Sequence, residues 1–423
     1  MKEHFLHYLW KYQKFITTQF VGVDGEQIQV SKPGILNVHQ GPDFLMAQMV
    51  IDGQQWAGTV EIHVKSSHWY QHHHEVDSNY DSVILHVVWE HDVAIFRKDH
   101  SVIPTLEIAS LVAPNILKNY TLLQIPSTSF LVCKDHLGAV PDMIFEQWID
   151  GLFVHRMNQK SLEIMKRLTQ TANHWEAVLL EHLISGFGLH INASAFKSIV
   201  QSVPFAVIQK CSEDPLQLEA LLMGQAGLLD ASGIDAYYLK LQSQYHYLRS
   251  KYRLENKTVQ SPSFFRLRPA SFPTLRLSQF ANLWSQKRKL FTALMQVTTK
   301  EQVYELLSIK ASDYWDIHYN FGVTSSKSKK QLSKSFMDLL IVNTIVPLQF
   351  TYQKKHHSVS ENNYLELALS LIAEKNTIVG EFQKYRSIQN TAFHSQALLH
   401  LKKEYCDLKM CPSCAIGCHI LSR

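Results

Sequence analysis

The chain has 423 residues, of which 46% are hydrophobic, so it can bury roughly three-quarters of its unfolded surface but is too long for one compact core. Its 41 basic and 37 acidic residues leave a net charge of +4, which excludes a partner selected by overall charge alone. No apolar run reaches the roughly 20 residues of a membrane span, and the N-terminus is unlike a secretory signal. We therefore expect a cytoplasmic protein of two or three domains, without membrane contact.

An α/β head is expected over residues 1–115. Residues 4–15 repeat apolar side chains at three- and four-residue spacing, which predicts an amphipathic helix. The pair Asp52-Gly53 separates two strand-like runs, as in a hairpin turn. The run VILHVVW is apolar enough for a buried central strand. The strands expected in this head are 44–51, 55–65, 83–89, 93–96 and 104–108.

Beyond the head, apolar residues follow the helical period, which predicts a mainly α-helical body over 116–400. This body is expected to divide near 255–263 or 324–335. The expected helices include 143–168, 174–184, 194–202, 216–228, 235–253, 280–295, 300–307, 335–346, 364–373 and 392–405. The predicted fold class is therefore α+β: a mixed β-sheet head with a helix, a hairpin and a further strand, then the helical body, then a cysteine-rich segment at 401–423.

One face of the second predicted strand carries three chemically active side chains. Residues two apart in a strand share a face, so Glu61, His63 and Lys65 project together. If 44–51 pairs with this strand, Asp43 lies at the open end of its neighbour and reaches the same space. Carboxylates and an imidazole can bind a divalent ion, while a lysine can stabilise charge or orient a water. Phosphodiester cleavage uses these groups.

The order of helix, hairpin and strand, with GPDF before one strand and VEIHVK on the next, resembles the PD-(D/E)XK nuclease superfamily. The resemblance implies that Asp43 and Glu61 hold Mg²⁺ or Mn²⁺ and that Lys65 assists catalysis. The superfamily usually has its second acid two residues before the lysine, where this chain has His63. Either His63 has become a ligand or the resemblance is only partial. In the alternative structural interpretation, Glu61 and Lys65 form an ion pair on the sheet face while Asp43 caps a turn.

Further histidines surround this strand. His72, His73 and His74 follow it, and His86 lies within the apolar run at 83–89. Histidine can bind metals, transfer protons or contact phosphate. Consecutive histidines rarely all face one ion, so a solvated loop is the simpler interpretation of the first three. His86 needs a hydrogen-bond partner, because an unpaired polar group inside an apolar strand is costly.

Several phrases of the sequence resemble an uncharacterised bacterial domain-of-unknown-function family. In the head they are GPDF, VEIHVKSSHW and ILHVVW; further along they are LEALLMGQAGLL at 218–229, FRLRPASFPTLRLSQFA at 265–281 and YCDLKMCPSCAIG at 405–417. Such sequences usually have Asp before the tryptophan of the second phrase, whereas this chain has His68. The resemblance implies kinship over most of the chain but brings no activity with it.

Basic residues gather between 253 and 289, where Glu255 is the single acid. Arg266, Arg268 and Arg276 surround a proline-containing turn with phenylalanines nearby. Arginine alternating with aromatic residues can bind phosphates and stack on bases, so nucleic acid is an expected partner. Arginines in a helical body can also bridge helices, which is the alternative interpretation.

Four of the six cysteines lie near the C-terminus, at Cys406, Cys411, Cys414 and Cys418. This distribution is unlike a secreted disulfide framework and fits a reducing compartment. Four thiolates at this spacing can hold a zinc ion or an iron–sulfur cluster, and spacing does not distinguish the two. His419 as the fourth ligand, a three-cysteine arrangement and unligated thiols are the alternatives.

Three functions follow from these features. The first is a metal-dependent nuclease or phosphodiesterase that acts on nucleic acid. The second is a non-catalytic module that binds nucleic acid or protein, and the third is a structural scaffold joined by its C-terminal metal. They differ in whether Asp43 and Glu61 hold one cation and whether Lys65 pairs with Glu61. The sequence has neither a Walker loop nor a G-x-G-x-x-G motif, so nucleotide hydrolysis and dinucleotide chemistry have no support.

Overall fold

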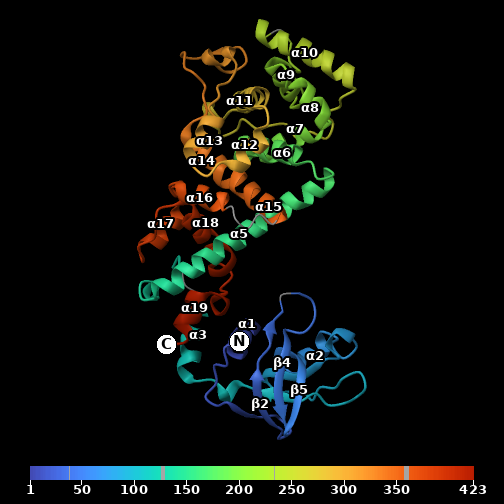
Figure 1. Cartoon of the computed structure of the whole chain (residues 1–423), viewed down its shortest axis with the longest axis vertical. Helices are drawn as coiled ribbons and strands as arrows, with labels where there is room; N and C mark the ends of the chain where they lie inside the picture. Colours follow the sequence, from blue (N-terminus) through green and yellow to red (C-terminus); the bar gives the residue numbers. More distant parts are fainter. Residues whose placement is uncertain (38, 125–128, 233, 357–361) are drawn as a thin grey trace. The chain divides into compact units, whose positions relative to one another are not determined.

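The structure is a computed structural model that describes the chain except residues 38, 125–128, 233 and 357–361. The chain forms two compact units (Figure 1). The sheet unit comprises 1–152, 376–387 and 398–423, and the helical unit comprises 153–375 and 388–397. This grouping differs from the sequence-derived segments 1–115, 116–400 and 401–423, because the C-terminal segment packs within the same unit as the sheet.

The sheet unit contains seven strands in the order β1-β2-β4-β5-β6-β7, with β3 beside β4. Strands β1 to β5 pair antiparallel, whereas β6 is parallel to β5 and β7 is parallel to β6. The strands are β1 (Gln19–Val21), β2 (Gln27–Lys32), β3 (Ile35–Leu36), β4 (Phe44–Ile51), β5 (Gln54–Lys65), β6 (Val83–Glu90) and β7 (Thr105–Glu107). The expected hairpin is β4–β5 and the expected central strand is β6. Strands β1, β2 and β3 were not predicted.

Helix α1 (Glu3–Lys11) packs against β5 and buries Phe5, Leu9 and Trp10. It ends before the predicted residue 15, because Gln13 adopts a positive φ of 48° that interrupts a right-handed helix. Its aromatic side also faces α3 (Pro114–Gln124): the Phe5 and Tyr120 rings stack with centroids 3.9 Å apart. Helix α1 therefore lies between the sheet and the helices of the same unit.

The connection between the parallel strands β5 and β6 is a short crossover made of α2 (His68–Gln71) and the turn η1 (Ser78–Tyr80). Buried Trp69 anchors it in a small core with Val83, Ile95 and Ile103. The predicted strand at 93–96 is wrong, since this segment makes only an isolated bridge from Phe96. The reason is the anchoring of the preceding Asp92, whose carboxylate accepts hydrogen bonds from the start of α2.

The C-terminal segment belongs to the sheet unit. The Tyr8 hydroxyl lies 2.9 Å from Ser422 Oγ, and Asn119 Nδ2 donates to the Ile420 carbonyl at 3.2 Å. A Cβ on Gly417 would approach the Cys411 carbonyl oxygen to 2.1 Å, so close packing of the last helix requires glycine there. The other elements of this unit are η2 (Ala109–Leu111), α3 (Pro114–Gln124), α4 (Lys134–Leu137), α17 (Thr377–Gln383), the π-turn η6 (Lys402–Cys406), η7 (Cys411–Ser413) and α19 (Ala415–Leu421).

The helical unit confirms the helical body, with differences in its boundaries. Lys289, at φ 57°, divides the predicted helix 280–295 into α11 and α12. Helices α5 (Asp142–Gln170) and α18 (Ala392–Leu401) begin in one unit and end in the other. The remaining helices are α6 (Trp175–Phe187), α7 (Leu189–Gln201), α8 (Phe205–Cys211), α9 (Pro215–Gln225), α10 (Ala236–Tyr252), α11 (Pro273–Gln286), α12 (Leu290–Gln296), α13 (Lys300–Leu306), α14 (Lys334–Leu340), α15 (Val346–His356) and α16 (Asn363–Ser370). Shorter elements are η3 (Pro269–Ser271), η4 (Asp313–Ile317), β8 (His318–Asn320), β9 (Val323–Thr324) and the π-turn η5 (Ile341–Ile345).

Among the residues that the structure describes, no single helix is long and apolar enough to cross a membrane. Helices α7 and α8 reach that length and composition only together, across a bend of 94°.

A buried carboxyl, Glu219 of α9, organises the polar contacts inside the helical unit. Trp315 Nε1 donates to it at 2.8 Å, the Tyr237 hydroxyl at 2.9 Å and Ser278 Oγ at 2.8 Å, and Ser312 Oγ also donates to it. Burial raises the pKa of Glu219, while these hydrogen bonds act in the opposite direction. The glutamate of the LEALLMGQAGLL phrase therefore joins α9 to α10, α11 and η4.

We expect Glu219→Ala to lower the free energy of unfolding by about 3 kcal/mol or more, because it leaves several buried donors unpaired. Urea denaturation of the full chain measures this change. Glu213→Ala, at an exposed position just before α9, is the matched control and should change stability little. Equal effects of the two variants would contradict a structural role for the Glu219 network.

Candidate metal centre in the sheet unit

Strand β5 places Glu61 and His63 on one buried face of the sheet. The two side chains are 5% and 1% exposed, and Val60 and Ile62 alternate with them to the other face, as the sequence predicts. Phe44 pairs with Val60, which brings the preceding Asp43 opposite Glu61. The pairing of β4 and β5 shifts after Phe44 at a bulge, so the residues before β4 turn toward the buried face.

Glu61 connects two sets of contacts. Its Oε2 accepts a hydrogen bond from the Asp43 backbone N–H at 3.1 Å. Its Oε1 lies 3.5 Å from His63 Nε2 and 3.4 Å from His74 Nε2. One oxygen therefore joins β5 to the start of β4, and the other faces a group of imidazoles.

Two imidazole nitrogens, from His63 and His74, lie near this second oxygen, and a third imidazole, His72, adjoins His63. His63 Nε2 lies 3.2 Å from His72 Nδ1, and one ring nitrogen from each of His63, His72 and His74 lies within 4.8 Å of the other two. A tetrahedral ion with ligand bonds of about 2.0–2.1 Å separates neighbouring ligand atoms by about 3.4 Å. The spacings of 3.2, 3.4 and 3.5 Å match this geometry. The three imidazoles fit one divalent cation, and the Glu61 carboxyl lies beside two of them.

His72 and His74 come from the segment for which a solvated loop was the simpler interpretation of the sequence. Helix α2 and the turn after it fold this segment back over β5. Because His73 adopts a positive φ of 59° and is exposed, the chain reverses there, and the flanking histidines both reach the strand. The three consecutive histidines after VEIHVK were visible in the sequence. The convergence of His72 and His74 on β5, however, depends on the turn at His73.

Buried neighbours orient the ligand rings. His63 Nδ1 lies 2.9 Å from His86 Nε2, which supplies the hydrogen-bond partner that His86 was expected to need. The Tyr80 ring stacks on His74 with centroids 3.7 Å apart, and Trp69 meets the same imidazole edge-on at 5.4 Å. Second-layer contacts of this kind fix the ring orientation of metal-binding histidines.

The electrostatics of the metal-free cluster favour neutral groups. Burial and neighbouring imidazoles lower the pKa of His63 to about 2, so its ring stays neutral and keeps a lone pair for a cation. Burial and the Asp43 charge raise the pKa of Glu61 to about 9. A cation would favour the ionised form of Glu61 and replace its proton.

A second polar group adjoins the first, on α1. Glu3, His7 and Asp43 each place one ligand atom within 4.8 Å of the others. Asp43 Oδ2 accepts from the Ile62 N–H at 2.9 Å and lies 3.3 Å from His7 Nε2. Burial acts to lower the pKa of His7, but the hydrogen bond and charge of Asp43 prevail and raise it. The structure therefore places Asp43 next to Glu61, with its carboxylate directed to α1 rather than to the three histidines.

Lys65 lies at the exposed end of β5. Its Nζ is 2.9 Å from Glu90 Oε1, on the neighbouring residue of parallel strand β6. The alternative in which Lys65 pairs with Glu61 is wrong, because the sheet register sets Glu90 opposite Lys65. The two side chains are 44% and 54% exposed, so this ion pair contributes little to stability.

The predicted nucleic-acid-binding arginines have different surroundings. Arg266 and Arg268 are exposed, whereas Arg276 is 7% exposed. Arg276 lies 3.6 Å from the centroid of the Phe336 ring and donates to Gln279 Oε1 at 3.0 Å. Its guanidinium therefore serves helix packing, the alternative interpretation, and is not accessible to a phosphate.

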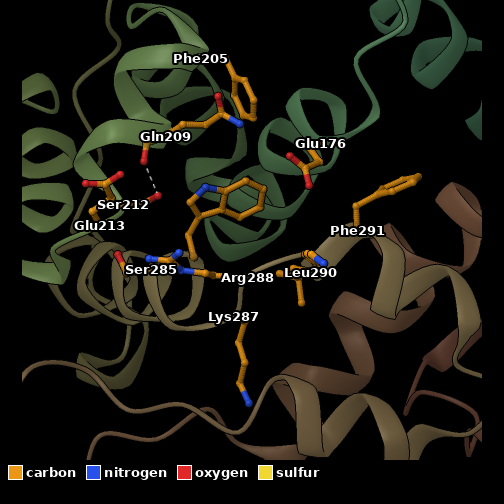
Figure 2. Close-up of a pocket in the computed structure, with 12 residues that line it drawn as sticks. Glu176, Phe205, Gln209, Ser212, Glu213, Ser285, Lys287, Arg288, Leu290 and Phe291 are labelled. Atoms are coloured by element: carbon orange, nitrogen blue, oxygen red, sulfur yellow. Dashed lines mark hydrogen bonds between the residues drawn. The ribbon is translucent and has the colours of Figure 1, made fainter.

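A cavity of about 230 Å³ also lies in the helical unit, between α8, the end of α11 and the start of α12. Figure 2 shows Arg288 near Ser285, while the side chain of Lys287 extends away from the aromatic rings. Phe205 and Phe291 line it together with acidic Glu176 and Glu213. The cavity thus combines aromatic surface with charges of both signs.

The C-terminal cysteines lie in the sheet unit. The Cys418 thiol donates to the Pro412 carbonyl at 3.1 Å, and Cys414 is 7% exposed. Cys133, which is distant in sequence, lies in the same unit.

Comparisons with known proteins give a family but no activity. A search of curated proteins and a search of solved structures each returned no match. The model of a family described as "Protein of unknown function (DUF2851)" matches residues 3–377, which includes both candidate ligand groups of the head. The chain therefore belongs to the DUF2851 family.

Proposed function

We propose that the sheet unit binds one divalent transition-metal ion through His63, His72 and His74, with the Glu61 carboxyl beside them, and that it hydrolyses phosphodiester bonds. The observation that carries the proposal is that one ring nitrogen from each of the three histidines lies within 4.8 Å of the other two, while Glu61 Oε1 lies 3.4 to 3.5 Å from two of them. Three imidazoles and one carboxylate suit Zn²⁺ or Mn²⁺ better than Mg²⁺, which prefers oxygen ligands.

The phosphodiester assignment depends on the strand order as well as on the donors. A helix, an antiparallel hairpin and a parallel strand reached by a crossover surround the site, with Asp43 before one hairpin strand and Glu61 on the other. This arrangement supports the resemblance to PD-(D/E)XK nucleases. In this chain His63 takes the place of the usual second acid, which supports its role as a ligand.

Other residues of the chain orient the proposed ligands, hold a proton and leave one side open to substrate. A Zn²⁺ or Mn²⁺ ion supplies a Lewis acid that polarises a phosphoryl oxygen and lowers the pKa of water. His86 orients His63, and Asp43 orients Glu61 through its backbone N–H. His7, whose pKa is raised beside Asp43, can hold a proton for a leaving oxygen. His72 is exposed, so substrate approaches from its side.

Metal binding is tested by titrating Zn²⁺ and Mn²⁺ into chelator-treated full chain by calorimetry. We expect one ion per chain, and His63→Ala or His74→Ala should weaken its binding at least about 100-fold, since even second-layer changes cost up to that amount. His73→Asn is the matched control: it changes the exposed histidine between two ligands and keeps a residue that tolerates positive φ. Unchanged affinity in His63→Ala would refute the site.

Hydrolysis is tested separately with labelled single- and double-stranded DNA and RNA in the presence of the ion that binds. We expect cleavage of at least one substrate, lost about 100-fold or more in Glu61→Gln and retained in His73→Asn. A chain that binds the ion tightly, with a raised melting temperature and no cleavage, would contradict the hydrolase and support the scaffold.

Non-catalytic nucleic-acid binding is the second candidate, and the exposure of two arginines favours it. Arg266 and Arg268 are both accessible, and the Arg266 guanidinium lies 5.0 Å from the Phe265 ring centroid. Such a pairing of cation and exposed ring suits a phosphate and an adjacent base.

We expect Arg266→Ala with Arg268→Ala to reduce the salt dependence of duplex DNA binding by about two in slope, because each phosphate contact contributes about 0.9. Fluorescence anisotropy at several salt concentrations measures the slope. Lys240→Ala, an exposed cation on α10, is the control. If the arginine double variant keeps the wild-type slope, as the Lys240→Ala control should, these arginines do not contact nucleic acid.

A further inference from the structure

Cys133 lies against the C-terminal segment although it is far from it in the sequence. Lys402 Nζ is 4.6 Å from the centroid of the Phe130 ring. Lys409 Nζ donates to the Gln124 carbonyl at 3.1 Å. The chain before Cys133 is therefore attached to the C-terminal segment at two positions, one on either side of Cys406.

Four thiols form a mutually interacting set. Electrostatic interaction links every pair among them, which requires all four sulfur atoms to be near one another. The four are Cys133, Cys406, Cys411 and Cys414. They come from the turn before α4, the π-turn η6, and both ends of the short turn η7.

Cys418 has a different partner. Its thiol interacts with those of Cys411 and Cys414, but it donates its hydrogen bond to the Pro412 carbonyl at 3.1 Å. The sequence spacing offered Cys418 as the fourth ligand, since it is near in the chain. The fold instead brings in Cys133.

The surroundings of the four thiols suit a bound, negatively charged group. The buried Trp148 indole N–H lies beside the Cys414 sulfur, where it favours the thiolate. The cations Lys2, Lys402 and Lys409 are close enough to favour thiolates. Burial raises the pKa of Cys133 to about 12 and that of Cys414 to about 11, so without a metal these thiols keep their protons.

We propose that Cys133, Cys406, Cys411 and Cys414 bind a [4Fe–4S] cluster. In any trio of the described thiols, at least two sulfur atoms are more than 4.8 Å apart. A single zinc ion, with Zn–S bonds of about 2.3 Å, would hold its sulfur ligands about 3.8 Å apart. In a four-iron cluster each thiolate binds a different iron, so the protein sulfur atoms are more widely separated.

Each thiol loses its proton when its sulfur bonds to iron. The sulfur atoms of the cysteines are neither oxidised nor reduced in this step. The cluster joins the turn before α4 to η6 and η7, and η7 in turn contacts α1. It thus stabilises the sheet unit from the side opposite Glu3 and His7 on that helix. This inference stands independently of the proposed hydrolase, because none of the four cysteines contacts the histidine centre.

The test is the iron and acid-labile sulfide content of the full chain, purified or reconstituted without oxygen. We expect four of each per chain, with the visible absorption of an iron–sulfur cluster. Cys133→Ser should lose most of both. Cys418→Ser, the matched control in the same segment, and Cys211→Ser, in the helical unit, should keep them. Full iron content in Cys133→Ser, or no iron in the reconstituted wild type, would overturn the proposal.

Alkylation of the wild-type chain tests the same four cysteines without variants, so the result does not depend on whether a variant folds. Chelator and oxidant treatment of the loaded protein should expose four thiols to iodoacetamide together, and peptide mass mapping should identify them as Cys133, Cys406, Cys411 and Cys414. Protection of Cys418 in place of Cys133 would contradict the assignment.

Discussion

The Glu61 carboxyl is the constraint around which the sheet unit is arranged. A buried carboxyl requires partners for both oxygens, since an unpaired one is costly. The Asp43 backbone satisfies one oxygen and thereby fixes the start of β4 against β5. The other oxygen faces His63 and His74, and burial lowers the pKa of both imidazoles. A divalent ion would complete this arrangement of neutral imidazole donors beside a carboxyl group whose pKa is raised.

Helix α1 connects the two proposed centres of this unit. One side carries Glu3 and His7, which adjoin Asp43. The other side carries Phe5 against Tyr120 and the Tyr8 hydroxyl against Ser422, beside the C-terminal segment. Both proposed centres therefore adjoin the same helix. The grouping of the C-terminal segment with the sheet follows from these contacts.

Local patterns were sufficient for part of the fold and of the site. The alternation along VEIHVK placed Glu61 and His63 on one face, and the Asp52-Gly53 turn fixed the hairpin that sets Asp43 beside them. The other members of the histidine cluster depend on tertiary structure. His72 and His74 converge because the chain reverses at His73, and a run of three histidines does not reveal that reversal.

Three further assignments depend on contacts between residues that are far apart in the sequence. Lys65 shares a strand face with Glu61, but the parallel register of β6 places Glu90 beside its ammonium group. Cys133 is separated from the other thiols by the whole helical unit, so cysteine spacing favoured Cys418 instead. Arg276 resembles Arg266 and Arg268 in sequence, yet the packing of Phe336 buries it.

The most direct test of the account is anomalous diffraction from crystals of the full chain grown with Zn²⁺ or Mn²⁺, recorded at the absorption edge of the added metal. The account predicts a peak about 2.0–2.1 Å from one ring nitrogen of each of His63, His72 and His74, with the Glu61 carboxyl beside it. A peak held by Glu3 and Asp43 without these histidines, or no peak in the head of a chain saturated with metal, would contradict it.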